Sequence, residues 1–183
     1  MILSIYVYGS AVLKKKALPV TEDYEGLQQL IADMKETLAN AEGVGLAAPQ
    51  VGHSIRLFIV DGAPFKKNEA ALATFQRVMI NPEITEYSAG TSSFNEGCLS
   101  IPDIHEDVVR PNEVRIRYLD ERFEAQEEHL KGIAARIVQH EFDHLEGNVF
   151  TEKLSPIRRK LVSGKLKNIA RGKASASYKT RIA

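Results

Sequence analysis

The stretch "LKGIAARIVQHEFDHLEG", residues 130–147, is the segment on which the predicted fold depends. It predicts a helix from Leu130 to Glu146, because Gly147 stands where a left-handed residue commonly ends a helix. At helical spacing, one face of this helix carries Ile133, Ile137, His140 and His144. The two histidines therefore continue an apolar stripe, and we expect them to face the protein core.

His140, Glu141 and His144 form the pattern H-E-x-x-H, which indicates a metal site. Histidines at positions i and i+4 lie one turn apart on one helical face, so both imidazoles can reach a single ion. Glu141 borders that face and can reach a water on the ion without being a ligand. The alternative is a pair of hydrogen-bonded core histidines, but burying two imidazoles and a carboxylate without a metal is costly.

A catalytic ion of this kind needs three protein ligands and one open position. The extended metalloprotease pattern would place a third histidine at residue 150, which is Phe, so that subclass is excluded. The remaining candidates for the third ligand are Cys98, His105, His129, Glu146 and Glu152. Cys98 lies in a Glu-Gly-Cys turn within "NEGCLSIP", residues 95–102, but a lone thiol is also commonly a small buried hydrophobic residue. The residues alone leave the choice open.

The glycine-rich segment "GVGLAAPQVG", residues 43–52, contains G-x-G-x-x-A but does not indicate a dinucleotide site. That fingerprint follows a strand and opens a helix, whereas here a helix is predicted before it and Pro49 prevents a regular helix after it. There is no lysine for a phosphate-binding loop. We expect the segment to bring a peptide-like substrate close to the backbone at Gly43 and Gly45 and to present Gln50. A simple helix-to-strand turn is the alternative.

The rest of the chain predicts one helix and several strands around the histidine-bearing helix. Thr21 can cap a helix that extends to Gly43 and has an acidic first turn. β-Branched and aromatic runs predict strands at residues 55–60, 77–85 and 113–120, and segment 61–76 looks like a loop or short helix. We therefore predict a single α+β domain, with mixed or antiparallel sheets around a central metal-binding helix.

Charged residues are distributed unevenly along the chain, although its net charge is zero. Residues 153–183 carry 10 Lys and Arg and no acidic residue, so the other 14 basic and 24 acidic residues leave residues 1–152 at −10. We expect a catalytic domain over residues 1–155 and a basic C-terminal helix or tail over residues 156–183. The tail suits contact with RNA, or is a solvated end. One cysteine, no leader sequence and no apolar run of membrane-spanning length predict a cytoplasmic protein.

Three segments in order, "GVGLAAPQVG" (43–52), "EGCLSIP" (96–102) and "QHEFDHLEG" (139–147), resemble the three motifs of bacterial-type peptide deformylases. These enzymes remove the formyl group from N-formylmethionine of newly made proteins, and the resemblance extends over most of residues 1–155. It implies that the metal ligands are Cys98, His140 and His144. It further implies that Glu141 is the general acid/base, and that Gln50 and the backbone N–H of Leu99 bind the developing oxyanion.

The resemblance also implies one divalent ion, Fe(2+), for which Ni(2+), Co(2+) or Zn(2+) can substitute. The ligand set alone does not select iron, since two imidazoles and a thiolate suit zinc equally well. The candidate substrate-binding residues are Val44, Gly45, Gly97, Ile133 and Ile137. For the two isoleucines, a plain core role is the alternative. Glu96 and Arg110 stand where the family has an ion pair that braces the cysteine turn.

The expected partners are N-formylmethionyl nascent peptides and, through the basic tail, the ribosome, with no membrane contact and a monomeric chain. Two other functions compete with this interpretation. An H-E-x-x-H metallopeptidase is disfavoured by a cysteine ligand and the small size of the chain. A structural zinc module would need a fourth ligand, and none is evident beside Cys98, His140 and His144.

Overall fold

The computed structural model describes all 183 residues and contains three α-helices with strands packed around one of them. The helices are α1 (Leu27–Asn40), α2 (Gly132–Leu145) and α3 (Pro156–Ala170). The strands are β1 (Ile5–Tyr6), β2 (Gly45–Ala47), β3 (Leu57–Asp61), β4 (Gln76–Tyr87), β5 (Thr91–Cys98), β6 (Ile101–Pro111), β7 (Glu113–Leu119), β8 (Ala125–Lys131) and β9 (Thr180–Arg181). The predicted class, a single α+β domain, is confirmed.

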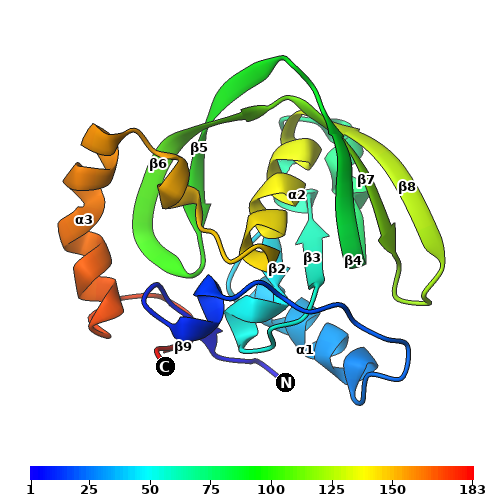
Figure 1. The fold of residues 1–183 in the computed structure, drawn as a ribbon, viewed down its shortest axis with the longest axis horizontal. Helices are drawn as coiled ribbons and strands as arrows, with labels where there is room; N and C mark the ends of the chain where they lie inside the picture. The colour runs from blue at the N-terminus through cyan, green and yellow to red at the C-terminus, as the bar shows by residue number, and fades with distance from the viewer.

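The strands form three sheets. The largest is antiparallel, with the order β2-β3-β4-β7-β8, and β5 and β6 form a separate antiparallel hairpin. The short strands β1 and β9 pair in parallel. Figure 1 shows α2 in the middle of the molecule, enclosed by strands of the large sheet and by the hairpin.

Two helices cover opposite faces of the large sheet, which explains the continuous apolar run in β3. Leu57 and Ile59 pack with α1 in one core cluster, whereas Phe58 and Val60 pack with α2 in another. Because both faces of β3 are buried, its sequence lacks the polar alternation of a half-exposed strand. The sheet therefore holds α2 on its inner side, where the histidines lie.

Helix α2 differs from its predicted bounds at the N-terminal end. Leu130 and Lys131 belong to β8, and Gly132, with φ of 55°, turns the chain from strand to helix. At the other end Gly147 has φ of 78°, as expected for a residue that follows a helix.

The predicted start of the first helix is wrong. We expected Thr21 to cap it, but α1 begins at Leu27, because Gly26 adopts φ of 75° and interrupts the helix there. The predicted strands correspond to β3, β4 and β7, and segment 61–76 contains two short 3-10 helices, Ala63–Phe65 and Ala70–Thr74. The prediction omitted the short strands β1, β2 and β9 and the longer strands β5, β6 and β8, and many polar residues in the longer three obscure their pairing.

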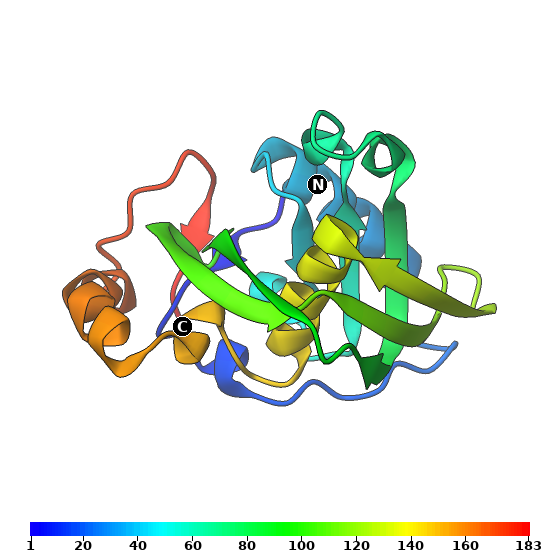
Figure 2. The same cartoon turned by 90° about the horizontal axis from the view of Figure 1, so that it is seen from above.

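The C-terminal region packs on the domain. Ser155 caps α3 by accepting a hydrogen bond from the backbone N–H of Arg158, and the buried face of α3 contacts a core cluster that includes β6. That buried face consists of Val162, Leu166 and Ile169. After α3 the chain returns, and β9 pairs with β1 (Figure 2). None of the helices is both long enough and apolar enough to span a membrane.

Candidate metal centre

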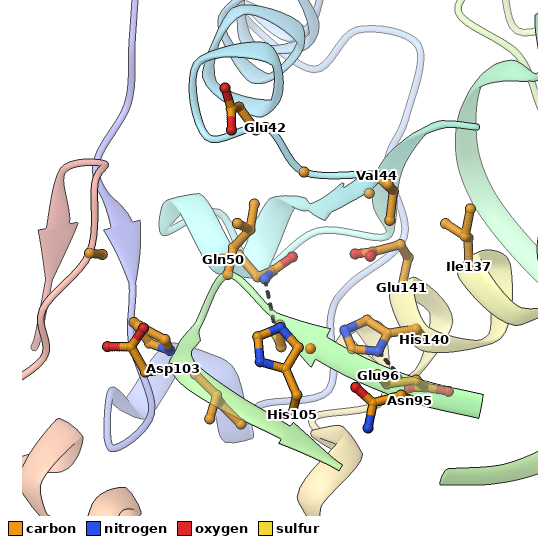
Figure 3. Close-up of a pocket in the computed structure, with 18 of the residues that line it drawn as sticks. Glu42, Val44, Gln50, Asn95, Glu96, Asp103, His105, Ile137, His140 and Glu141 are labelled. Carbon is orange, nitrogen blue, oxygen red and sulfur yellow. Dashed lines mark hydrogen bonds and ion pairs between the residues drawn. The ribbon is translucent and has the colours of Figure 1, made fainter. Parts of the chain in front are cut away.

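One cleft of about 440 Å³ brings the three sequence segments together (Figure 3). The predicted site residues that line it are Val44, Gly45, Gln50, Gly97, Cys98, Leu99, Ile133, Ile137, His140 and Glu141. His144 is buried behind this surface, with 1% of its area exposed. Residues that lie about 100 positions apart in the sequence thus form one site, because β2, the β5–β6 turn and α2 meet there.

Cys98, His140 and His144 form a cluster in which one donor atom from each lies within 4.8 Å of the others. The Sγ atom of Cys98 is 3.3 Å from Nε2 of His144. The other candidates for the third ligand lie outside this cluster: His129 contacts Glu113, and Glu146 contacts Arg56. Among the alternatives that the sequence left open, the geometry favours Cys98.

The chemistry of these groups fits a divalent ion. Two imidazoles and a thiol are ligands that zinc and similar transition metals accept. Burial holds the pKa of His144 well below its usual value, so its ring is neutral and can donate a lone pair. Two buried polar atoms beside the cluster, Nδ1 of His144 and Oε2 of Glu141, have no hydrogen-bond partner within the protein.

Glu96 is the buried acceptor that orients this cluster. It receives two hydrogen bonds from Arg110, at 2.7 and 3.0 Å, and one at 3.0 Å from Nη1 of Arg136. Its Oε2 atom is also 3.0 Å from Nδ1 of His140, which leaves the other ring nitrogen for an ion. Burial alone would raise the pKa of Glu96, but hydrogen bonds from His140 and Arg110 outweigh it and lower the pKa to about 2.

The ion pair expected between Glu96 and Arg110 is therefore present, but the role of Arg136 was missed. Arg136 also donates to the carbonyl of Val108 at 2.8 Å and to the carbonyl of Ser92 at 2.7 Å. It thereby fastens α2 to both strands of the β5–β6 hairpin. The sequence held one signal: an arginine directly before Ile137, in the helix turn that leads to His140, at the edge of a face predicted to be buried.

Glu141 lies under the glycine-rich segment. A Cβ atom on Gly45 would come within 2.3 Å of Oε1 of Glu141, so only glycine fits above the carboxylate. Burial raises the pKa of Glu141 to about 7. A carboxylate with that pKa can exchange a proton near neutral pH, as a general acid/base must.

Gln50 connects the glycine-rich segment to the cysteine turn. Its Oε1 atom accepts a hydrogen bond from the backbone N–H of Ala47 at 2.8 Å. Its Nε2 group donates to Oγ of Ser100 at 3.1 Å and makes a longer contact of 3.6 Å with Sγ of Cys98. Ser100 was not predicted, although it belongs to the same "EGCLSIP" segment.

Comparison with known proteins identifies the family. The sequence model of the polypeptide deformylase family matches residues 2–160. The chain belongs to the peptide deformylase family. A peptide deformylase of Christiangramia forsetii is 47% identical over 189 residues, which cover 100% of this chain and 96% of the relative. That of Salinibacter ruber is also 47% identical and covers 97% of this chain and 93% of its own length.

Solved peptide deformylase structures have the same fold. The Legionella pneumophila enzyme has a TM-score of 0.81 at 38% identity and covers 93% of this chain and 96% of its own. The Thermus thermophilus enzyme has a TM-score of 0.82 at 37% identity and covers 94% of this chain and 100% of its own.

Peptide deformylases are metal-dependent enzymes that remove the N-formyl group from nascent proteins, and this chain is an enzyme of that type. Membership of this family excludes the two alternative functions that the sequence left open, a metallopeptidase and a structural zinc module.

Proposed function

We propose that Cys98, His140 and His144 hold one divalent ion and that Glu141 performs the proton transfers of deformylation. The observation that carries this assignment is the convergence of three distant segments on one cleft, with three ligand atoms within 4.8 Å of one another and a buried carboxylate beside them. All of these groups belong to residues 1–155, which we propose as the catalytic domain, with residues 156–183 as a C-terminal extension.

When bound, the ion supplies Lewis-acid polarisation of the formyl carbonyl and a water acidic enough to attack near neutral pH. Glu141 would accept a proton from the attacking water as the water oxygen adds to the formyl carbon. The carboxylic acid then donates the proton to the departing nitrogen as the carbon–nitrogen bond breaks. The products are formate and a protonated N-terminal amine once the proton of formic acid passes to the amine, so Glu141 returns to its starting carboxylate state.

Gln50 and Leu99 are the proposed donors to the formyl oxygen. The backbone N–H of Leu99 forms no hydrogen bond with the rest of the chain, so it is free to donate. The Nε2 group of Gln50 can exchange its long 3.6 Å contact with Cys98 for the oxygen while it keeps its bond to Ser100. Donors that are fixed before the reaction stabilise the developing charge without a cost of reorganisation.

The apolar end of the cleft is the proposed methionine pocket. Val44, Ile133 and Ile137 line it, and Figure 3 places Val44 and Ile137 on the same side of Glu141. An unbranched thioether suits such a pocket because it adapts to irregular apolar walls. Gly45 and Gly97 carry no side chain that would keep a peptide backbone away, and we assign them to substrate binding for that reason.

We infer Fe(2+) as the native ion, with Ni(2+), Co(2+) and Zn(2+) as substitutes, because the family motifs are intact and the ligand set accepts all four. We also infer that the protein is a monomer, since one chain supplies every proposed catalytic group. We infer that it acts in the cytoplasm. Contact with the ribosome through α3 is supported by the run of basic residues 158–160, which lies between the exposed apolar residues Ile157 and Leu161.

Metal binding and chemistry can be tested separately. Metal-free protein is dialysed anaerobically against Fe(2+), and bound metal and formate release from an N-formyl-Met peptide are measured for two variants. Cys98→Ala should lose both, because a ligand is missing, whereas Glu141→Gln should keep the metal and lose formate release. Full metal occupancy in Cys98→Ala would overturn the ligand assignment, and normal turnover in Glu141→Gln would overturn the role of Glu141.

A further inference from the structure

The segment after α3, residues 171–183, lies against the body of the protein, and we refer to it as the C-terminal strap. The carbonyl of Lys179 accepts a hydrogen bond from the backbone N–H of Ile5 at 2.8 Å, and β9 pairs with β1. The hydroxyl of Tyr178 donates to the carbonyl of Leu99 at 2.8 Å. Chain ends usually fray unless they are tied down, and this one is tied to the cysteine turn itself.

The strap forms one wall of the cleft. Ser175, Ala176, Ser177 and Tyr178 line it together with the catalytic groups. In Figure 3 the red C-terminal segment is nearest to Asp103, on the side opposite Val44 and Ile137. The cleft therefore extends past the proposed metal ligands, from the apolar pocket to the strap. The family match ends at residue 160, so it does not cover this wall.

The strap is chemically suited to bind main chain rather than particular side chains. The peptide groups of residues 174–178 form no hydrogen bond with the rest of the protein. Ser175, Ala176 and Ser177 are exposed, small and uncharged, so they offer close approach to the backbone without charge selection. An extended peptide can pair with such a segment through its own N–H and C=O groups.

The substrate fixes what can occupy this end of the cleft. The formyl group ends the substrate, so nothing precedes it, and the methionine side chain is assigned to the apolar pocket. Only the residues that follow methionine remain to reach the strap. We propose that Ser175–Tyr178 is a subsite for the main chain of the residues after formylmethionine, an inference that rests on the proposed orientation of substrate in the cleft.

The kinetic test compares N-formyl-Met amide with N-formyl-Met-Ala-Ser-Ala amide. Ala176→Trp should lower kcat/KM for the tetrapeptide by about tenfold, the equivalent of one or two hydrogen bonds, and leave the short substrate unchanged. Lys179→Trp is the matched control, since Lys179 is an exposed strap residue that does not line the cleft, and it should behave as wild type on both substrates.

Equal losses of kcat/KM for the two substrates in Ala176→Trp, or no loss for either, would overturn the proposed subsite. A binding measurement separates this failure from failure of the proposed catalytic roles. Backbone amide exchange at residues 174–178 should slow when the product Met-Ala-Ser-Ala amide is added, and should not slow with Met amide, whether or not the preparation releases formate. Unchanged exchange at a saturating product concentration would overturn the proposal by itself.

Discussion

Replacing Glu96 with glutamine should be far more destabilising than the loss of one charge on the surface. Its Oε1 atom accepts hydrogen bonds from Arg110 and Arg136, and its Oε2 atom accepts from Arg110 and faces Nδ1 of His140. Glutamine has one acceptor oxygen, so its NH₂ group must face two donors. The side chains of Arg110, Arg136 and Glu96 are 3%, 7% and 4% exposed, so water cannot replace the missing acceptor.

The expected cost follows from these contacts. Two charge-assisted hydrogen bonds are lost at ~1.5–3 kcal/mol each, and breaking a buried ion pair typically costs ~3–5 kcal/mol, so we expect Glu96→Gln to lose about 3–5 kcal/mol of unfolding free energy. Denaturant unfolding of the metal-free wild type and variant measures this difference in unfolding free energy. The affinity for Fe(2+) should also fall by about 10–100-fold, because the ring of His140 loses its acceptor.

Glu106→Gln is a matched control in the same hairpin. Glu106 lies opposite Glu96 in the β5–β6 register, but its partner Arg158 is 55% exposed and can turn to water. We expect a loss of about 1 kcal/mol or less. Similar losses of unfolding free energy in the two variants, or a loss below ~1 kcal/mol for Glu96→Gln, would refute the inference that Glu96 stabilises the site as a shared buried acceptor.

Three further predictions concern catalysis, the acid stability of the fold and the metal. Gln50→Ala should lower kcat about 100-fold through the loss of ~3 kcal/mol of transition-state stabilisation, yet cost less in unfolding free energy; retained turnover would contradict its role. Hydrogen bonds from Arg77 and Tyr118 lower the pKa of Glu128 despite its burial, so its stabilising contribution is present above the ordinary carboxyl pKa and is lost as pH falls through the lowered one. The stability difference between wild type and Glu128→Gln, from denaturant unfolding at neutral and acidic pH, should therefore shrink on acidification, and a constant difference would contradict this. Activity should decay in air and persist under anaerobic handling, because a Cys98 thiolate beside iron is open to oxidation; full stability in air would argue against iron.

The central features of the site could be predicted because their signals are local. Histidines spaced by one helical turn, on a face shared with Ile137, predict a buried helix, which the structure confirms, and a pair of candidate metal ligands. The α+β class followed from that helix and the apolar strands around it. The choice of Cys98 as third ligand was not local, and it depended on family resemblance until the geometry placed the thiol beside His144.

The parts that were missed depend on tertiary contacts. Strand β5 reads "TSSFNEGC", which is too polar to predict a strand, and it is stabilised by pairing with β6 and by Arg136 from α2. The start of α1 was misplaced because the acidic residues after Thr21 resemble a first helical turn, whereas Gly26 sets the boundary. Nothing in "KASASYKT", residues 173–180, indicates that Tyr178 reaches the carbonyl of Leu99, since that contact depends on the direction in which α3 leaves the domain.

Formate release from an N-formyl-Met tripeptide tests the proposed deformylase activity and the role of Glu141 together. Anaerobically purified wild type is assayed beside Glu141→Ala, with the unformylated peptide as a substrate control. We predict formate from the wild type acting on the formylated peptide, and none from Glu141→Ala or from the control peptide. Formate at the wild-type rate from Glu141→Ala would contradict the role of Glu141, and no formate from wild type with a fully occupied metal site would contradict the deformylase activity.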